Sequence, residues 1–479
     1  MVTVGAALWP AVRASRIPPV AAIGDLPEAR VETFRRRTVV GLLLLAVGVP
    51  VLLVGISRAQ QAEDALDELP VVGLGALLLF FGIVVLLATF ARPLARWFGV
   101  PVRAAAGVPG AIARGNAMRN PRRTAATASA LVIGLALVAM VAVLGDSAKA
   151  QIDASDSNLE AELVLDTTQF TGFSPEVIDR VESLRDVKSA VGFHFGRIPV
   201  DGRPQRIIGM NGTGLADAFD LQLERGSTAE LGIDGILLAR EEASELGWAR
   251  GDAVTLSFPL GDRTVRVVGV YGADDISFGS PMFVSRELFR TSVPEADLDY
   301  RAYVKVAPGV PVRTAKAAVE REIGRDFPNL EVLTQDQARD AEAELVDQFL
   351  GVLVALLFLS EAIAVLGIVN TLALSVHERT HEIGMLRAVG MTRRQLRRSV
   401  RWESVIIAAI GGTVGLALGL VWAWAFTTAL ETEDLFRLRV PLGRIALLAL
   451  LSLFAGAIAA VIPAWRASRL EIFDAIARE

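Results

Sequence analysis

Six long apolar runs, separated by polar and charged segments, dominate the pattern of hydrophobic positions along this chain. They cover Thr38 to Ser57, Val71 to Ala91, Thr124 to Gly145, Gln348 to Val376, Ser404 to Leu430 and Ile445 to Ala464. All of them approach or exceed the ~20 residues that an α-helix needs to cross a bilayer. Buried core helices of a soluble protein are the alternative, which several charge-free runs of this length in one chain disfavour. The pattern predicts an α-helical multi-pass membrane protein with six spans.

A segment of mixed pattern, Asp146 to Glu344, separates the third span from the fourth and is long enough to bury its own core. Alternating or β-branched stretches predict strands at Ala161 to Asp166, Arg206 to Gly209, Ala253 to Ser257, Thr264 to Gly269 and Tyr300 to Val306. Helical spacing predicts helices over Pro175 to Leu184 and Val312 to Phe327. We expect a mixed α/β domain of two subdomains, a βαβ-like one from both ends of the segment and a small β-rich one from its middle.

Charge divides the chain into two parts. The segment Asp146 to Glu344 holds 35 acidic and 21 basic residues, whereas the rest of the chain holds 18 acidic and 27 basic residues. Arginine is concentrated in the connectors before the first span, between the second and third, and between the fourth and fifth, which predicts that these connectors and both chain ends are cytoplasmic. The acidic domain then lies outside. This split also argues against nucleic-acid binding.

A short sequence occurs near both ends of the chain. Pro10-Ala-Val-Arg-Ala-Ser-Arg-Ile17 returns as Pro463-Ala-Trp-Arg-Ala-Ser-Arg-Leu470, at an offset of 453 residues. The second copy follows the last span, so the first copy should also follow a membrane helix, of which Val2 to Trp9 would be the end. We expect residues 1–37 to be the end of a preceding half and a cytoplasmic linker.

The segment after the fourth span has the pattern of a short charged helix. It reads Val376-His-Glu-Arg-Thr-His-Glu-Ile-Gly-Met-Leu-Arg-Ala-Val-Gly390, with apolar residues roughly on one face and charges on the others. Gly390 is suited to end this helix before Thr392 starts the next. We expect residues 377–403 to form a coupling region that continues the span stiffly and receives force from a cytoplasmic partner. A solvated juxtamembrane helix is the simpler interpretation.

The same segment permits a different function, because His377-Glu-Arg-Thr-His381 matches the H-E-x-x-H pattern of zinc proteases. An intramembrane zinc metalloprotease would use His377, Glu378 and His381. A catalytic zinc needs a third ligand, no histidine follows His381, and only Glu382 and Glu403 are nearby carboxylates. We therefore expect no metal site, no catalytic residue and no cofactor.

Other chemistry is limited by residue usage. The chain has no cysteine, which excludes thiolate metal sites. None of its lysines follows a glycine, as a phosphate-binding loop requires, so ATP hydrolysis is expected in a separate subunit. His194, the one histidine of the external domain, is expected to be a surface or strand residue rather than a catalyst. A non-transporting signalling or scaffold protein of the same topology is a further alternative.

Residues 93–123 are expected to form a cytoplasmic or interfacial segment. They end in Arg114-Gly-Asn-Ala-Met-Arg-Asn-Pro-Arg-Arg-Thr124, where Asn120 can cap a helix whose first residue is Pro121. The arginines would meet anionic lipid headgroups at ~1 kcal/mol each. The segment is either an amphipathic interfacial helix or a plain basic flank of the third span.

Polar and small residues also occur inside the spans. Glu361 and Asn370 are the intramembrane polar residues of the fourth span. Because an ionisable side chain is costly in lipid, Glu361 should face the bundle as a buried, hydrogen-bonded carboxyl, with a proton-relay role as the alternative. In the fifth span, Gly411, Gly415 and Gly419 form successive small-xxx-small steps, which predict close helix packing.

The run from Gly367 to Gly390, the segment from Arg114 to Thr124 and the repeated Pro-Ala-x-Arg-Ala-Ser-Arg sequence together resemble the FtsX-like permease family of ABC transporters, which includes macrolide exporters and lipoprotein-releasing permeases. The order of parts is also similar: one span, a large external domain, then three spans. The resemblance implies that the helix after the fourth span docks on a dimeric ATP-binding subunit. The residues that it assigns to this contact are Glu378, Arg379, Glu382, Gly384, Arg387 and Gly390.

The resemblance further implies a permease subunit in the cell membrane that couples cytosolic ATP hydrolysis to motion of the extracytoplasmic domain. That motion would serve export, lipoprotein or lipid extraction, or control of cell-wall enzymes. The two spans within residues 38–92 resemble the linker of duplicated ten-span members, so an N-terminal permease half or a second permease is an expected partner beside membrane lipids. The other expected parts are a span at 124–145, the domain at 146–344, a span at 345–376, two spans within 404–465 and a cytoplasmic tail at 466–479. The family's proline in that tail is present at Pro19 but replaced by Ile472 in the second copy.

Overall fold

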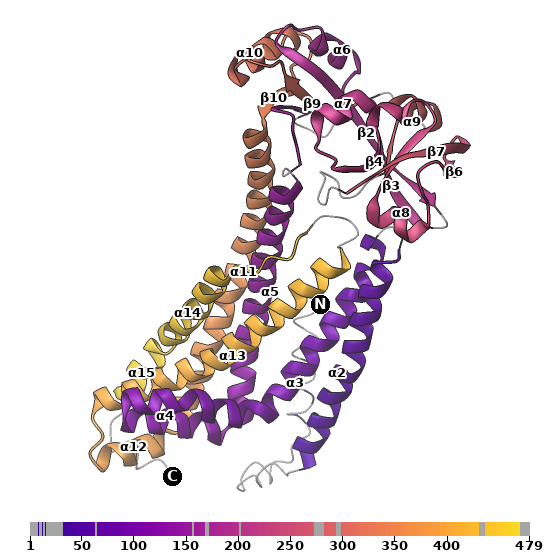
Figure 1. Ribbon diagram of the computed structural model, residues 1–479. Coiled ribbons are helices and arrows are strands. Elements are labelled where there is room, and N and C mark those ends of the chain that lie inside the picture. Colours follow the sequence, from indigo (N-terminus) through magenta and orange to yellow (C-terminus); the bar gives the residue numbers. More distant parts are fainter. Residues whose placement is uncertain are drawn as a thin grey trace.

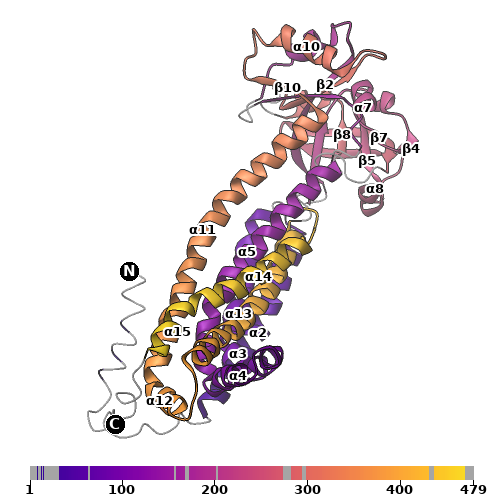
Figure 2. The same ribbon diagram turned by 90° about the vertical axis from the view of Figure 1, so that its left-hand side faces the viewer.

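A long helical bundle carries an α/β domain at one end (Figure 1). The computed structural model describes residues 32–62, 65–155, 158–167, 172–200, 203–272, 282–293, 298–430 and 436–469, together with Leu8, Val12 and Ser15. Two helices, α5 (Pro121–Ser155) and α11 (Gln335–Glu378), leave the bundle side by side and end at the domain (Figures 1 and 2). Most of the first copy of the repeated sequence, and the tail beyond Arg469, lie outside the described residues.

The described part of the chain has six helical segments long and apolar enough to cross a membrane, which confirms the six predicted spans. They are α2 (Glu32–Ala59), α3 (Ala65–Ala106), α5, α11, α13 (Arg393–Ala429), and α14 (Leu442–Ala459) together with α15 (Val461–Ser468). Several of these helices continue well beyond the apolar runs. For example, α11 starts far outside its run, at a capping box formed by Thr334 and Gln337.

The two linker spans, α2 and α3, form a hairpin that belongs to the bundle. They pack through glycines: a Cβ atom added to Gly75 would lie 2.5 Å from the backbone nitrogen of Leu52. Only glycine lets two helix backbones approach so closely. The hairpin lies against α13, where the rings of Phe80 and Trp422 are 6.2 Å apart between centroids.

Helix α5 packs on α13 through the three glycines predicted for this purpose. Cβ atoms added to Gly411, Gly415 and Gly419 would lie 2.8, 2.8 and 2.4 Å from the backbone oxygens of Ala128, Val132 and Ala136. Each step of four residues along α13 is matched by a step of four along α5. The two backbones are therefore in contact over three successive turns, which confirms the predicted close packing.

Helix α11 meets α5 in a different way, through side chains that lie against glycines. A Cβ atom added to Gly134 would lie 2.0 Å from Glu361 Oε2, and one added to Gly145 would lie 2.2 Å from Leu350 Cδ1. Glu361 thus faces the bundle, as predicted. Its Oε2 atom is buried without a hydrogen-bond partner in the described part of the chain, so the predicted hydrogen bond is not found there. Asn370 is exposed, because nine residues, two and a half helical turns, place it on the opposite face of α11.

The first part of the α/β domain is an antiparallel sheet in the order β10-β1-β9-β2, with two helices on one face. Its elements are β1 (Leu163–Thr167), α6 (Glu176–Glu182), β2 (Val187–Val200), β9 (Arg301–Val306), α10 (Val312–Ile323) and β10 (Leu330–Thr334). Both β1-α6-β2 and β9-α10-β10 are split βαβ units, since a strand of the other unit lies between their two strands. This confirms the βαβ-like subdomain predicted from the two ends of the segment.

The middle of the segment forms the predicted β-rich part. Its strands are β3 (Arg203–Gly209), β4 (Leu223–Gly226), β5 (Gly235–Ala239), β6 (Ala253–Phe258), β7 (Gly261–Tyr271) and β8 (Met282–Val284), in the order β3-β8-β5-β7-β4 with β6 paired to β7. Short helices connect them: α7 (Gly212–Ala218), η2 (Thr228–Leu231), α8 (Arg240–Leu246) and α9 (Arg286–Ser292). The five strands predicted for the whole segment are all present, as β1 and β9 in the first part and β3, β6 and β7 in this one.

The long strand β2 joins both parts into one ten-stranded sheet. Its residues up to Phe193 pair with β9, and those from His194 onward pair with β3. One buried cluster, which includes Phe193, Ile208 and Tyr303, extends across both parts, whereas two further clusters belong to one part each. The two parts therefore share a core.

A buried charged cluster marks the point where β2 changes its partner. His194 Nδ1 lies 3.1 Å from Asp299 Oδ1, and Arg286 Nη2 donates a hydrogen bond to Asp299 Oδ2 at 2.6 Å. Burial raises the pKa of the Asp299 carboxyl to about 6, although the nearby Arg286 guanidinium opposes this effect. His194 is a strand residue, as expected, but it is 2% exposed, so a surface position is wrong.

Candidate coupling site

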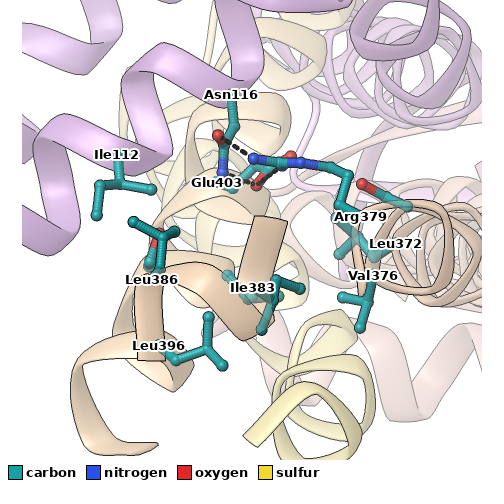
Figure 3. A pocket seen from close by; sticks show the side chains of 12 residues that line it. Ile112, Asn116, Leu372, Val376, Arg379, Ile383, Leu386, Leu396 and Glu403 are labelled. Atoms are coloured by element: carbon teal, nitrogen blue, oxygen red, sulfur yellow. Dashed lines mark hydrogen bonds and ion pairs between the residues drawn. The ribbon is translucent and has the colours of Figure 1, made fainter. Parts of the chain in front are cut away.

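The candidate coupling site lies at the end of the bundle opposite the α/β domain, where α4 (Val108–Arg119), α12 (Thr380–Ala388) and α13 meet (Figures 1 and 3). Its apolar base is formed by Ile383 of α12, Leu396 and Val400 of α13, and Ala464 and Ala467 of α15. These buried side chains fix one face of α12 against the bundle. Gly384 is buried on the same helix.

A tight turn connects α12 to α13, as predicted. Gly390 has φ of 110°, a conformation that residues with a side chain rarely adopt, and it follows the end of α12. Thr392 and Gln395 then form a capping box that starts α13. The turn therefore has a defined conformation.

The junction between α11 and α12 departs from the expected continuous helix. Arg379 has φ −104° and ψ 19°, which ends α11 at Glu378 and lets α12 begin at Thr380. Thr380 Oγ1 donates a hydrogen bond to the backbone oxygen of His377 at 2.7 Å, a local bond that competes with the helical ladder. The prediction of a stiffly continuous helix is wrong at this residue.

At this break the Arg379 side chain turns inward and joins a network with Asn116 of α4 and Glu403 of α13 (Figure 3). Arg379 Nη2 donates a hydrogen bond to Asn116 Oδ1, and Asn116 Nδ2 donates one to Glu403 Oε2 at 2.9 Å. Arg379 Nη1 lies 3.8 Å from Glu403 Oε2. Glu403 is 5% exposed and Asn116 is 9% exposed. Three helices are thus connected by a closed and largely buried polar network.

The acidic residues assigned to partner contact have partners within the chain. Arg123 Nη1 donates a hydrogen bond to Glu378 Oε2 at 3.2 Å. Glu382 Oε2 accepts a hydrogen bond from Arg379 Nε at 3.0 Å and lies 3.9 Å from Arg119 Nη1. These pairs are partly exposed, and such pairs contribute only about 0–1 kcal/mol each. These pairs connect the end of α11 to the start of α5, and α12 to α4.

The surface of α12 that remains open is largely apolar. Met385 is 48% exposed, Leu386 37% and Val389 89%, and Val389 lies next to the Gly390 turn. Arg387, between them in the sequence, is partly buried. An apolar edge of this kind is suited to contact with another protein.

Two residues of this site were not among the predicted ones. Asn116 lies in the segment from Arg114 to Thr124, but its partner Glu403 is 287 residues away in the sequence, so no local pattern pairs them. Glu403 did carry a signal: a carboxylate next to an apolar span is costly to bury and usually has a partner.

No metal centre is formed by the H-E-x-x-H sequence. The described residues contain no group of three or more His, Cys, Asp or Glu side chains placed to share a metal ion. The break at Arg379 also lies between His377 and His381, so the two do not share one uninterrupted helical face. The arrangement does not favour the protease alternative.

Comparison with known families identifies both membrane and external parts. The model of the FtsX-like permease C-terminal family matches residues 354–472, and that of the MacB-like periplasmic core domain matches residues 124–322. The chain belongs to the FtsX-like permease family. The α/β domain is accordingly extracytoplasmic. The first match includes α12, Arg379 and Glu403, whereas Asn116 precedes both matched segments.

Several members of this family resemble the chain over much of its length. It is 25% identical over 395 residues to the pyoverdine export ATP-binding/permease protein PvdT of Pseudomonas putida, which covers 75% of this chain and 58% of that protein. It is 28% identical over 241 residues to the macrolide export ATP-binding/permease protein MacB of Chromobacterium violaceum, covering 48% of this chain and 36% of that protein. An uncharacterized ABC transporter permease protein of Mycobacterium tuberculosis is 22% identical over 427 residues, with coverages of 83% and 49%. The chain thus spans little more than half the length of these relatives, at most.

Two solved structures resemble the extracytoplasmic part. The periplasmic region of MacB from Actinobacillus actinomycetemcomitans aligns with 40% of this chain and 94% of its own, at 11% identity and a TM-score of 0.33. The extracellular domain of the noncanonic ABC-type transporter YknZ from Gram-positive bacteria aligns with 36% and 98%, at 16% identity and a TM-score of 0.30.

Proposed function

We propose that this chain is a permease part of an ABC exporter, in which an ATP-binding partner displaces α12 and thereby moves the extracytoplasmic domain. The observation that carries the proposal is a single connection between the two ends of the molecule. Helix α11 has 44 residues, begins directly after strand β10 and ends at the junction with α12. A helix of this length spans about 66 Å.

The exposed edge of α12, formed by Met385, Leu386 and Val389, is the surface that we assign to the partner. Its apolar side chains are held by the Gly390 turn on one side and by the network at Arg379 on the other. Among the predicted contact residues, Glu378, Arg379 and Glu382 then act mainly by fixing α12, while Gly384 and Gly390 allow its packing and its turn. Arg387 remains a proposed contact at the border of the edge.

The partner would be a dimer of ATP-binding subunits on the cytoplasmic side, where we also expect both chain ends from the arginine-rich connectors. Relatives named ATP-binding/permease proteins are consistent with this pairing. A second permease half, expected from the repeated sequence, would complete the membrane part. On the outside, the motion would serve export, extraction of lipoproteins or lipids, or control of cell-wall enzymes, which are the alternatives that the family resemblance implies.

Replacing Val389 by Asp tests this assignment. The charge would have to be buried at the centre of the contact, so binding of the ATP-binding partner should weaken at least tenfold, which corresponds to about 1.4 kcal/mol. The measurement is the dissociation constant of the complex in detergent or nanodiscs. Ile233→Asp is a matched control, because Ile233 is 65% exposed on the extracytoplasmic domain, where a cytosolic partner cannot reach. Equal affinities of the Val389 variant and the unchanged chain would contradict the assignment.

A further inference from the structure

The buried network at the α11–α12 break connects the end of α11 to two closely packed helices, α4 and α13. Helix α13 is fixed to α5 by backbone contacts at Gly411, Gly415 and Gly419. Helix α4 is fixed to the end of α3, because a Cβ atom at Gly110 would lie 2.4 Å from the backbone oxygen of Val102. Asn116 and Glu403 therefore project from a frame made of α3, α4, α5 and α13.

Helix α11 is covered by this frame over much less of its apolar surface than α5 and α13 are. In its most apolar stretch of 18 residues only 11% is buried, compared with 56% in the corresponding stretch of α5 and 61% in that of α13. Its contacts with α5 include the ends of the Glu361 and Leu350 side chains, which can change rotamer without moving either backbone. Arg379, at the end of α11, is by contrast tied to the frame from two sides.

The geometry of the three side chains makes this tie directional. The Asn116 amide accepts from Arg379 through Oδ1 and donates to Glu403 through Nδ2, so its two ends cannot be exchanged without losing both bonds. Inside a protein such a network is stronger than its counterpart in water, and an unmatched member is costly. The guanidinium is therefore held at one position while the helices on either side of it differ in direction.

We propose that Arg379, Asn116 and Glu403 form the pivot on which α11 turns when a partner displaces α12. The inference rests on the proposed function and adds the residues that position the moving part. With α12 about 14 Å long and α11 about 66 Å long, a small displacement of α12 becomes a larger one at the extracytoplasmic end of α11. All three are positioning residues, since none of them needs to touch the partner.

The test uses the full chain in complex with its ATP-binding partner. Glu344 of α11 and Val421 of α13 are both exposed, so each can be replaced by a cysteine that carries a spin label. The two labels report the distance between α11 and the frame. The chain has no cysteine of its own, so the labels are unique. Pulsed electron paramagnetic resonance measures this distance with and without a non-hydrolysable ATP analogue. The affinity for the partner is measured on the same variants.

In the unchanged chain the analogue should shift this distance. Glu403→Leu and Asn116→Leu should reduce the shift at least threefold while partner affinity stays within twofold. Glu403→Gln keeps an acceptor for Asn116 but loses the charge, so it should give an intermediate shift. If the leucine variants fail to fold, this variant tests the pivot in their place. Arg290→Gln is the control, because it removes an exposed pair with Glu287 in the extracytoplasmic domain, away from the network, and should leave the shift unchanged.

The two proposals fail in different ways. If the unchanged chain neither binds the partner nor responds to the analogue, the proposed function is wrong. If it responds and the Asn116 and Glu403 variants respond equally, the pivot is wrong. A loss of partner affinity in these variants, equal to that of Val389→Asp, would also overturn the pivot, because the residues would then belong to the contact itself.

Discussion

Helix α5 packs on two of its neighbours, α13 and α11, in opposite ways. Against α13 it makes contacts between backbones, with no room for a Cβ atom at Gly411, Gly415 or Gly419. Against α11 it is contacted by the ends of Glu361 and Leu350 side chains. Backbone contacts can open only if the helices separate, whereas side-chain ends can rearrange within a packed interface. We call the contact between α5 and α13 the closed seam and the contact between α5 and α11 the open seam. The packing indicates that the closed seam stays closed and that the open seam can change.

The same comparison explains how motion would reach the extracytoplasmic domain. Helix α5 leads to strand β1 and strand β10 leads into α11, and these two strands are paired from Leu163 with Thr334 to Thr167 with Leu330. A displacement of α11 relative to α5 therefore acts on neighbouring strands. Because the two parts of the domain share a core, the domain should respond as one body.

The largest effect is expected from adding one methyl group at the closed seam. Gly419→Ala would place a Cβ atom 2.4 Å from the backbone oxygen of Ala136, so the helices must separate, and the free energy of unfolding should fall by about 3 kcal/mol. Thermal or denaturant unfolding of the purified chain measures this. Gly443→Ala is the control, because no atom lies within 4 Å of its added Cβ, and it should be neutral or slightly stabilising. A neutral Gly419 variant would remove the distinction between the seams.

The second prediction concerns the stability of the extracytoplasmic domain. Asp299 has its pKa raised to about 6 by burial, from an ordinary value of 3.8, with His194, Arg286 and Asp179 around it. The folded domain thus binds this proton more tightly than the unfolded chain does, so the stabilisation is present in acid and is lost as the pH rises through 6. The free energy of unfolding should fall by about 2 kcal/mol between pH 4 and pH 7 through this group.

Asp299→Asn cannot ionise and should remove this pH dependence. Unfolding would be followed by a fluorophore on a cysteine introduced at Asp262, in the exposed β6–β7 hairpin. Glu230→Gln, which removes one side of an exposed pair with Arg250, should leave the pH dependence as it is. If the Asn variant kept the full dependence, the cluster would not be its source.

The smallest effect on stability is expected at the open seam. Gly134→Ala places its Cβ atom 2.0 Å from Glu361 Oε2, which is the far end of a flexible side chain, so Glu361 can move aside. The free energy of unfolding should change by less than about 1 kcal/mol. A destabilisation as large as that of Gly419→Ala, in the same assay, would show that both seams are equally rigid.

The helical and domain organisation could be predicted from the sequence because its signals are local. Apolar runs gave the six spans, and the glycine spacing of Gly411, Gly415 and Gly419 gave the closed seam. Strand β2 was not predicted, since its glycines and Pro199 interrupt the alternating pattern that marks a strand. The break at Arg379 was also missed, because helix propensity favours continuation there, and the hydrogen bond from Arg379 to Asn116 joins residues far apart in the sequence.

The candidate site shows the same limit. The charged helix, its Gly390 turn and its position after the fourth span follow from neighbouring residues. The pairing of Asn116 with Glu403, and that of Glu378 with Arg123, depends on the folded arrangement of helices far apart in the sequence. Both pairings lie next to the junction of α11 and α12.

The central claim is that the α5–α11 seam must change while the frame stays fixed. A disulfide between cysteines at Gly145 and Leu350 would lock that seam, because Leu350 Cδ1 already lies 2.2 Å from the position of a Cβ atom at Gly145. A disulfide between cysteines at Thr38 and Thr89, whose hydroxyl oxygens are 3.1 Å apart, would lock α2 to α3 and leave the α5–α11 seam free. The measurement is the ATP hydrolysis rate of the complex before and after reduction. The first lock should abolish the permease-dependent rate reversibly and the second should leave it unchanged, whereas full activity with the α5–α11 seam locked would contradict the account.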